Sequence, residues 1–422
     1  MRVFLTLVSF AMIALLASAF AQKPALEDYA RQLTYSAAAL SPDGSKIAVL
    51  TRIDGQVSLM VYAVSGRVVL QAPIQDIKAR AVQFVGNDYV VLRASETTRV
   101  LGFRSEFENS GAIAVNLKTK KAALLLNKTD DIFPAQSGLG DILGRGKADN
   151  TVLMRAFMGM RYTDNPPNNL LTVNLDTGRA SKLRNGRNST LQWIADGQGD
   201  ALARIDYDNR TNEFSVRKRD GNGWETIYKY TSEIPPFYVS GILPDKSGLV
   251  FIDSRDDEDG FDQFMVLDLN GDISGPVFAP RDREIGNVYY DRNGALLGVR
   301  YITEQVEEYE FLDQRLQSSF DAVNEVFLGS TVSLIDWSDD RSSILYRVYA
   351  DSLGHYYILH KPATNEIEYF ANLSPNIPKT EIASIYSISY DARDGLRIPA
   401  MLRVPRGVDL RSKPRLPAIM MP

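Results

Sequence analysis

The chain has 422 residues, of which 45% are hydrophobic and 23% charged, and its formal net charge is −5. This composition is typical of a globular protein with more than one core, and the lack of a basic block argues against nucleic acid as a partner. The sequence contains no cysteine, which excludes disulfides and thiolate metal sites.

The first 21 residues have the features of a secretory signal peptide. Arg2 supplies the positive charge, residues 3–16 are mostly apolar, and Ala19-Phe20-Ala21 is a small-x-small cleavage site. The apolar run is short for a membrane span, so we expect cleavage after Ala21 and no membrane association afterwards. The sequence therefore predicts an exported bacterial protein, periplasmic or secreted, whose mature chain begins with a lead-in segment over residues 22–34.

From Tyr35 onward one unit recurs: a short strand, a turn rich in Asp, Gly or Asn, and a strongly apolar strand. The apolar strands are expected to begin at Ile47, Tyr89, Thr151, Ala201, Leu249, Ala295 and Ile344, at intervals of 42, 62, 50, 48, 46 and 49 residues. In most units a second hairpin follows. Four strands per repeat of about 40–50 residues are typical of a propeller blade, whereas a β-sandwich has no fixed period. We therefore predict an all-β fold with a seven-bladed β-propeller over residues 35–375.

Two irregularities interrupt the repeat. The interval of 62 residues predicts an insertion within residues 96–110 or 128–147. In the sixth unit, a helix over residues 304–327 is expected in place of the second hairpin. Its apolar stripe, at helical spacing, consists of Leu312, Leu316, Phe320, Val323 and Phe327.

The chain lacks the motifs of a complete catalytic or metal site. No G-x-S-x-G is present, and the two histidines, His355 and His360, stand five apart on a predicted strand, where their side chains face opposite sides. The acidic residues 256–259 lack the ligand spacing of an EF-hand loop, so we interpret them as a solvated loop. We therefore expect no catalytic triad, no metal and no cofactor in this chain.

The final segment, residues 376–422, departs from the repeat. Tyr386, Ile388 and Tyr390 alternate with polar residues, and after Asp394-Gly395 a second alternating strand runs over residues 398–404. The apolar run 416–421 suits a buried strand, which needs neighbours on both faces. We therefore expect this segment to be the beginning of a further domain that is truncated here.

This segment resembles the beginning of the catalytic domain in the prolyl oligopeptidase family of serine peptidases, of the bacterial secreted dipeptidyl aminopeptidase or acylaminoacyl peptidase type. The likeness is carried by YDARDGLRIPA (390–400), PRG (405–407) and LPAIMMP (416–422), with FLDQRLQ (311–317) and SDDRS (338–342) upstream. It implies that residues 376–422 are the first strands of an α/β-hydrolase domain. The Ser-Asp-His triad would then lie beyond this chain, and the partners would be a peptide substrate and the missing C-terminal catalytic domain.

The resemblance also draws attention to Glu307 and Glu308. Some dipeptidyl peptidases of this family hold the free amino group of the substrate with paired glutamates on a propeller helix, through charge-assisted hydrogen bonds. The alternative is that both are exposed residues near the N-terminal end of the predicted helix, favoured there by its dipole.

Two classes of function follow from these observations. The leading interpretation is the substrate-gating propeller portion of a secreted serine peptidase that hydrolyses oligopeptides through an acyl-enzyme, with this chain alone inactive. The alternative is a free-standing periplasmic propeller that serves as a binding or assembly scaffold. A propeller glycosidase would need carboxylates that converge on the central channel.

Overall fold

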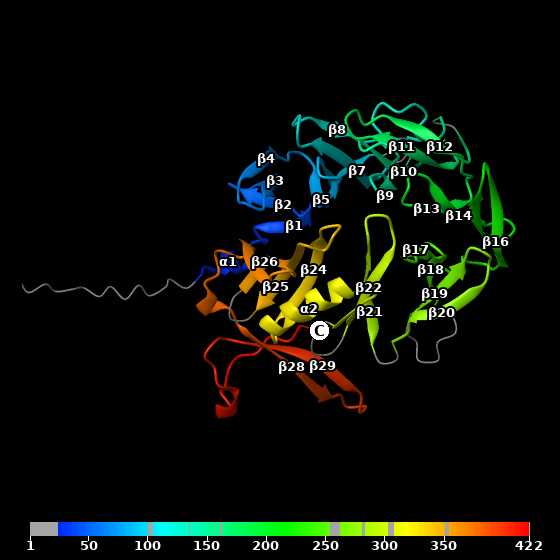
Figure 1. Cartoon of the computed structure of the whole chain (residues 1–422). Helices are drawn as coiled ribbons and strands as arrows, with labels where there is room; N and C mark the ends of the chain where they lie inside the picture. Colours follow the sequence, from blue (N-terminus) through cyan, green and yellow to red (C-terminus); the bar gives the residue numbers. More distant parts are fainter. Residues whose placement is uncertain are drawn as a thin grey trace, which may run out of the picture.

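A computed structural model describes residues 24–421, apart from 100–103, 135, 161–162, 254–261, 281–282, 303–307 and 351–353. The predicted signal peptide and the acidic residues 256–259 lie outside the described residues. Within the described part, seven antiparallel sheets follow one another around a ring, and an eighth sheet of two strands lies outside it (Figure 1). The ring is the seven-bladed β-propeller that the repeat predicts.

The strands of each blade are hydrogen-bonded in chain order. After a short helix α1 (Leu26–Ala30), the first three blades are β1 (Tyr35–Leu40), β2 (Lys46–Ile53), β3 (Gln56–Ala63) and β4 (Val68–Pro73); β5 (Lys78–Val85), β6 (Tyr89–Arg99), β7 (Glu106–Asn116) and β8 (Ala122–Leu124); and β9 (Ile142–Arg145), β10 (Thr151–Phe157), β11 (Asn168–Asn174) and β12 (Ala180–Arg184). The fourth and fifth blades are β13 (Thr190–Ala195), β14 (Ala201–Asp208), β15 (Glu213–Asp220) and β16 (Gly223–Thr231); and β17 (Val239–Ile242), β18 (Gly248–Asp253), β19 (Gln263–Asp268) and β20 (Ile273–Phe278). The sixth and seventh blades are β21 (Glu284–Tyr290), β22 (Leu296–Ile302) and β23 (Glu308–Phe311); and β24 (Thr331–Trp337), β25 (Ile344–Ala350), β26 (Gly354–Lys361) and β27 (Glu366–Asn372).

The apolar strands expected from the sequence are the second strands of the blades. Each begins within one residue of the expected position, as β6 does at Tyr89 and β25 at Ile344. These strands are apolar throughout because both of their faces are buried between neighbouring blades. In β2, Ala48 and Leu50 pack toward the second blade, whereas Ile47 and Val49 pack toward the seventh.

The hydrophobic core is accordingly divided into seven clusters, each of them between two adjacent blades. The cluster that closes the ring joins Leu40, Ile47 and Met60 of the first blade to Leu345 and Leu359 of the seventh. No strand is exchanged between these two blades, since β1–β4 and β24–β27 each form a complete sheet. Side-chain packing and a few polar contacts therefore hold the ring closed.

The second blade contains the predicted insertion in both of the segments considered. Strands β6 and β7 form a long hairpin, paired as far as Arg99 and Glu106. The segment after β8 then makes isolated bridges from Gly138 to Ser110 and from Ile132 to Met158. The extra length is thus divided between an extended hairpin and a loop that packs on its neighbours.

The helix in the sixth blade is shorter than predicted. Helix α2 spans Gln314–Val326, and the carboxylate of its N-cap Asp313 accepts the Arg315 backbone N–H at 3.0 Å. Its buried stripe is the one expected, except that Leu312 precedes the helix and is 40% exposed. The prediction was wrong for Glu308–Phe311, which form β23 because Tyr309 and Phe311 alternate with two glutamates and are buried.

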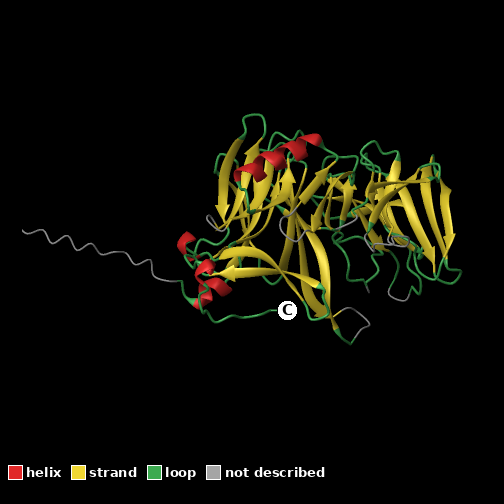
Figure 2. Ribbon diagram, turned by 90° about the horizontal axis from the view of Figure 1, so that it is seen from below, coloured by secondary structure: helices red, strands yellow, loops and turns green. Residues whose placement is uncertain are grey.

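After the seventh blade the chain forms 3₁₀ turn η1 (Lys379–Glu381), hairpin strands β28 (Ser384–Asp391) and β29 (Arg397–Val404), and 3₁₀ turn η2 (Leu410–Ser412). The hairpin lies on one face of the ring and α2 on the opposite face (Figure 2). The prediction of a buried strand at 416–421 was wrong for this chain. Those residues form no strand, and Ile419, Met420 and Met421 are at least 86% exposed, since no described strand lies beside them.

No helix within the described residues has both the length and the apolar character that a membrane span requires.

Candidate functional site

A cavity of about 780 Å³ lies at one end of the central channel. Its lining comes from six blades and, apart from Val152 of β10, from the first strand of each or the turn that follows it, as at Pro42, Gly86, Gly146, Gly197 and Gly294. The turns between first and second strands therefore form the rim of this cavity. We call this side of the ring the turn face, and the opposite side, where β28 and β29 lie, the hairpin face.

Aspartates build most of the turns on the turn face. In the first blade, Asp43 Oδ1 accepts hydrogen bonds from the Ser41 hydroxyl at 2.6 Å and from the Ser45 backbone N–H at 2.9 Å. Asp245 and Asp340 make equivalent contacts with Ser247 and Ser342. The pKa of Asp43 is lowered by these bonds despite its partial burial. The recurring Asp in the sequence repeat is thus explained by turn formation, a structural role.

Arg292 joins three blades at the rim. Its guanidinium donates to the Asp339 carboxylate at 2.8 Å, the Asp336 carboxylate at 3.1 Å and the Trp337 carbonyl at 2.7 Å, all in the seventh blade. It also donates to the Leu40 carbonyl of the first blade at 3.0 Å. Asp336 in turn accepts the Leu40 backbone N–H at 2.8 Å, and burial raises the pKa of its carboxyl while Arg292 opposes that shift.

The charges around the cavity balance. Four basic side chains, Arg145, Lys147, Arg292 and Arg341, line it together with the four carboxylates Asp149, Asp291, Asp336 and Asp339. Arg145 and Asp149 approach to 3.5 Å, and Arg341 pairs with Asp313 at the start of α2 at 2.9 Å. A polar cavity whose charges balance does not select between acidic and basic ligands through its net charge.

At the hairpin face, Glu308 begins β23 and its side chain is 49% exposed. Glu308 forms an ion pair with Arg283, whose guanidinium lies 4.5 Å from the Tyr301 ring centroid. The Tyr301 hydroxyl donates to Glu310 at 2.6 Å, and burial followed by this carboxylate raises the pKa of the hydroxyl. Glu307 lies outside the described residues. A substrate amine would therefore have to compete with Arg283 for Glu308.

The two histidines lie in different surroundings on β26. His355 is partly buried with its ring centroid 4.3 Å from that of Tyr349, and its pKa is lowered to about 4, first by burial and then by the charges of Arg347 and Arg403. Arg403 belongs to β29. His355 therefore lies where the seventh blade meets the hairpin.

His360 belongs to a buried polar chain that resembles part of a hydrolase triad. Its Nδ1 lies 2.8 Å from the Ser319 hydroxyl of α2, and its Nε2 lies 3.0 Å from Asn365 Oδ1. The Tyr346 hydroxyl also contacts Ser319, at 2.8 Å. Ser319, Tyr346 and His360 are at most 1% exposed, so no substrate can reach the serine. This chain of hydrogen bonds holds α2 against the seventh blade, and sequence spacing did not reveal it because its members are 41 residues apart.

Across the described residues, no group of three histidine, aspartate or glutamate side chains is placed to hold a metal ion.

Similar proteins are found by comparing folds, but not by comparing sequences. No family model matches the sequence, and no curated protein matches it. Among solved structures, a prolyl endopeptidase matches with a TM-score of 0.57 at 12% identity, covering 92% of this chain and 58% of that one. Prolyl oligopeptidase B from Galerina marginata matches with a TM-score of 0.57 at 9% identity, covering 91% of this chain and 57% of that one. Acylaminoacyl peptidase from Pyrococcus horikoshii matches with a TM-score of 0.51 at 10% identity, covering 87% of this chain and 57% of that one.

The fold and the channel thus define a seven-bladed β-propeller. More particularly, this chain has the fold found in part of prolyl endopeptidases and acylaminoacyl peptidase, and it spans less than three-fifths of the length of these chains. The resemblance to the prolyl oligopeptidase family, drawn from residues 376–422 and two segments upstream, is confirmed at the level of fold.

Proposed function

We propose that this chain is the substrate-gating propeller portion of an exported serine peptidase that cleaves oligopeptides. The observation that carries the proposal is a closed propeller with a channel, followed by a hairpin on one face, in a fold shared with prolyl peptidases. Residues 1–21 would direct export, residues 22–34 lead into the propeller of 35–375, and residues 376–422 begin the catalytic domain.

Gating follows from the dimensions of the channel. The cavity at the turn face has room for a few residues of extended peptide at about 780 Å³. A folded protein cannot enter a ring closed by the packed residues of blades one and seven. A catalytic domain seated on the hairpin face would therefore receive only short or unfolded peptides.

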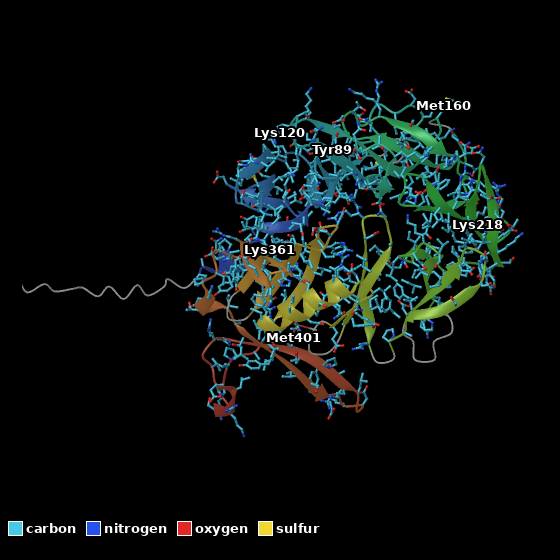
Figure 3. All side chains as sticks on the ribbon, in the orientation of Figure 1. Tyr89, Lys120, Met160, Lys218, Lys361 and Met401 are labelled. Carbon is cyan, nitrogen blue, oxygen red and sulfur yellow. The ribbon has the colours of Figure 1, made fainter. Side chains whose placement is uncertain are left out.

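The hairpin supports the presence of a further domain. Tyr386, Ile388 and Tyr390 of β28 share one face of the hairpin with Leu402 of β29, yet these side chains are 36–50% exposed. Figure 3 labels Met401 on this hairpin, outside the ring of blades. Two strands alone are marginally stable, and an apolar sheet face of this kind is suited to burial against a domain of the same polypeptide.

Catalysis itself is assigned to residues outside this chain. Acyl transfer needs an accessible hydroxyl activated by a histidine. His360 is buried with Ser319, and the pKa of each histidine is lowered by burial.

The experiment that tests the proposal uses a fluorophosphonate probe, which labels activated serines. The complete product of the gene should be labelled at one serine beyond residue 422 and should hydrolyse short peptides faster than a folded protein. This chain expressed alone should remain unlabelled. If the complete product is unlabelled as well, the peptidase proposal falls and the propeller is better studied as a binding scaffold.

Glu308 gives a narrower test of how the substrate is held. If it binds the free amino terminus of peptides, Glu308→Gln in the complete enzyme should raise KM for free peptides about 10-fold, with little effect on acetylated peptides. Glu310→Gln on the same strand is the matched control. Equal changes for free and acetylated peptides would assign Glu308 to its ion pair with Arg283 alone.

A further inference from the structure

Four arginines gather between the third and fourth blades, and two of them, Arg204 and Arg217, approach the same carboxylate. We call Arg187, Arg204, Arg217 and Arg219 the arginine cluster. The carboxylate is Asp206, whose side chain is 5% exposed. The cluster lies against the third blade, because Arg204 donates to the Asn185 carbonyl at 3.1 Å and Trp193 beside it donates to the Asn168 carbonyl at 3.0 Å.

Asp206 already accepts three hydrogen bonds. One of its oxygens accepts the Thr190 hydroxyl at 2.6 Å, and the other accepts two N–H groups of Arg204 at 2.9 and 3.1 Å. Arg204 is also held between Trp193 and Trp224 at 5.8 and 5.1 Å from the ring centroids. The single negative charge of Asp206 is therefore shared between Arg204 and Arg217, which lies 3.5 Å away.

Arg217 lies directly opposite Arg204 in the register of β14 and β15. Like charges at such positions are destabilising. The Arg217 side chain is only 22% exposed, and its Nε reaches Asp206 at 3.5 Å without making a hydrogen bond. A buried N–H without an acceptor costs about 1–3 kcal/mol, more beside another cation. The cluster thus has an excess of positive charge and a donor that lacks an acceptor among the described residues.

Two further observations agree with this excess. Arg219 donates to the Gly223 carbonyl at 2.8 Å and lies over the face of Trp224, and the carboxylate that its charge acts on, Asp200, is already paired with Arg184. Burial lowers the pKa of Arg204 and Asp206 opposes this shift, whereas the like charges of Arg187 and Arg217 add to it.

We propose that the arginine cluster binds a small oxyanion, with Arg217 as its main ligand. A guanidinium fork pairs with the two oxygens of a carboxylate, sulfate or phosphate in a way that a spherical anion cannot reproduce. The partial exposure of Arg217 lets such a group reach it from solvent. The site is separate from the channel cavity, and this inference does not rest on the peptidase proposal.

The test is thermal unfolding of the complete protein in sulfate, phosphate or acetate, each against chloride at the same ionic strength. Sulfate stabilises most proteins through exclusion from their surface, so the measured quantity is the difference between wild type and Arg217→Met. The wild type should gain about 1–2 °C in Tm more than the variant. In chloride the variant should be no less stable than wild type, since it removes an uncompensated cation.

The controls separate a site from a general salt effect. Arg93→Met breaks an exposed pair with Asp141 at 2.9 Å in the second blade and should keep the full response to oxyanions. Arg217→Lys keeps the charge without the fork and should weaken binding about tenfold by calorimetry. Saturation at lower acetate than sulfate would identify a carboxylate ligand, and the reverse a tetrahedral anion. Equal responses of wild type, Arg217→Met and Arg217→Lys would overturn the proposal.

Discussion

The seventh blade and the hairpin β28–β29 both pair antiparallel strands that carry apolar side chains, yet only the blade is buried. Leu345 and Leu359 pair across β25 and β26 and are at most 1% exposed. Tyr386 and Leu402 pair across β28 and β29 in the same antiparallel manner, but they are 42% and 36% exposed. The difference teaches that alternation is a local property of a strand, whereas burial needs a neighbouring sheet. Blade seven has a blade on each side, whereas no described sheet covers the face of the hairpin that carries Tyr386 and Leu402.

The largest expected effect comes from removing a side chain between blades one and seven. Leu345→Ala should lower the free energy of unfolding by about 2–5 kcal/mol, because it leaves a cavity in the cluster that closes the ring. Leu402→Ala on the hairpin is the matched substitution and should cost less than about 1 kcal/mol, since that side chain is already partly in water. Urea denaturation measures both. Equal losses would mean that the hairpin belongs to the same cooperative unit as the blades.

The second effect concerns the polar part of the same closure. Arg292→Ala should cost about 2 kcal/mol, because it leaves the Asp336 carboxylate without its cationic partner and two carbonyls without a donor at the junction of blades six, seven and one. Arg315→Ala is the control. The Arg315 side chain is 65% exposed and its ion pair with Asp313 is long, at 3.9 Å, and such an exposed pair contributes little to stability. Adding Asp336→Asn to Arg292→Ala should recover part of the loss. A double variant no better than the single one would show that Asp336 is satisfied without Arg292.

The same contrast explains how far sequence reasoning extends. The blades were predictable because the repeat combines two local signals, an Asp or Gly turn and a strand apolar on both faces, and each signal is enforced by a contact such as Asp43 with Ser45. The boundary between β23 and α2 was missed. Strand β23 has only four residues, Glu308–Phe311. Over so short a segment the alternation of apolar and polar residues is a weaker signal than the helical stripe that begins directly after it, at Leu312.

The sites were less predictable than the fold. Arg217 and Asp206 stand on neighbouring strands, and the hydrogen-bonded chain of Ser319 and His360 joins a helix to a blade. Such contacts depend on register and on the approach of elements distant in sequence, which no spacing rule encodes. Glu308 could be named only from the resemblance, and the structure adds its ion pair with Arg283.

The smallest expected effect concerns the contact between the seventh blade and the hairpin, where the charge of Arg403 acts on His355. The pKa of His355 is lowered to about 4, first by burial and then by Arg347 and by Arg403 of β29. In the unfolded chain the His355 imidazole binds a proton below about pH 6.5, whereas in the folded chain it stays neutral until the pH falls to about 4. The free energy of unfolding should therefore fall as the pH is lowered from about 6.5 to 4, and no further below that range.

Because His355 is only partly buried, the expected loss is about 1 kcal/mol at pH 4.5, well below the value for a fully desolvated group. Carboxylates titrate in the same range, so the quantity to measure is the difference between wild type and His355→Gln from pH 7 to 4.5. Arg403→Gln should reduce that difference, since it removes one of the two like charges, whereas Arg397→Gln near the other end of β29 should leave it unchanged. If Arg403→Gln has no effect, the hairpin does not rest against the seventh blade in solution, and the contrast between the two regions is sharper still.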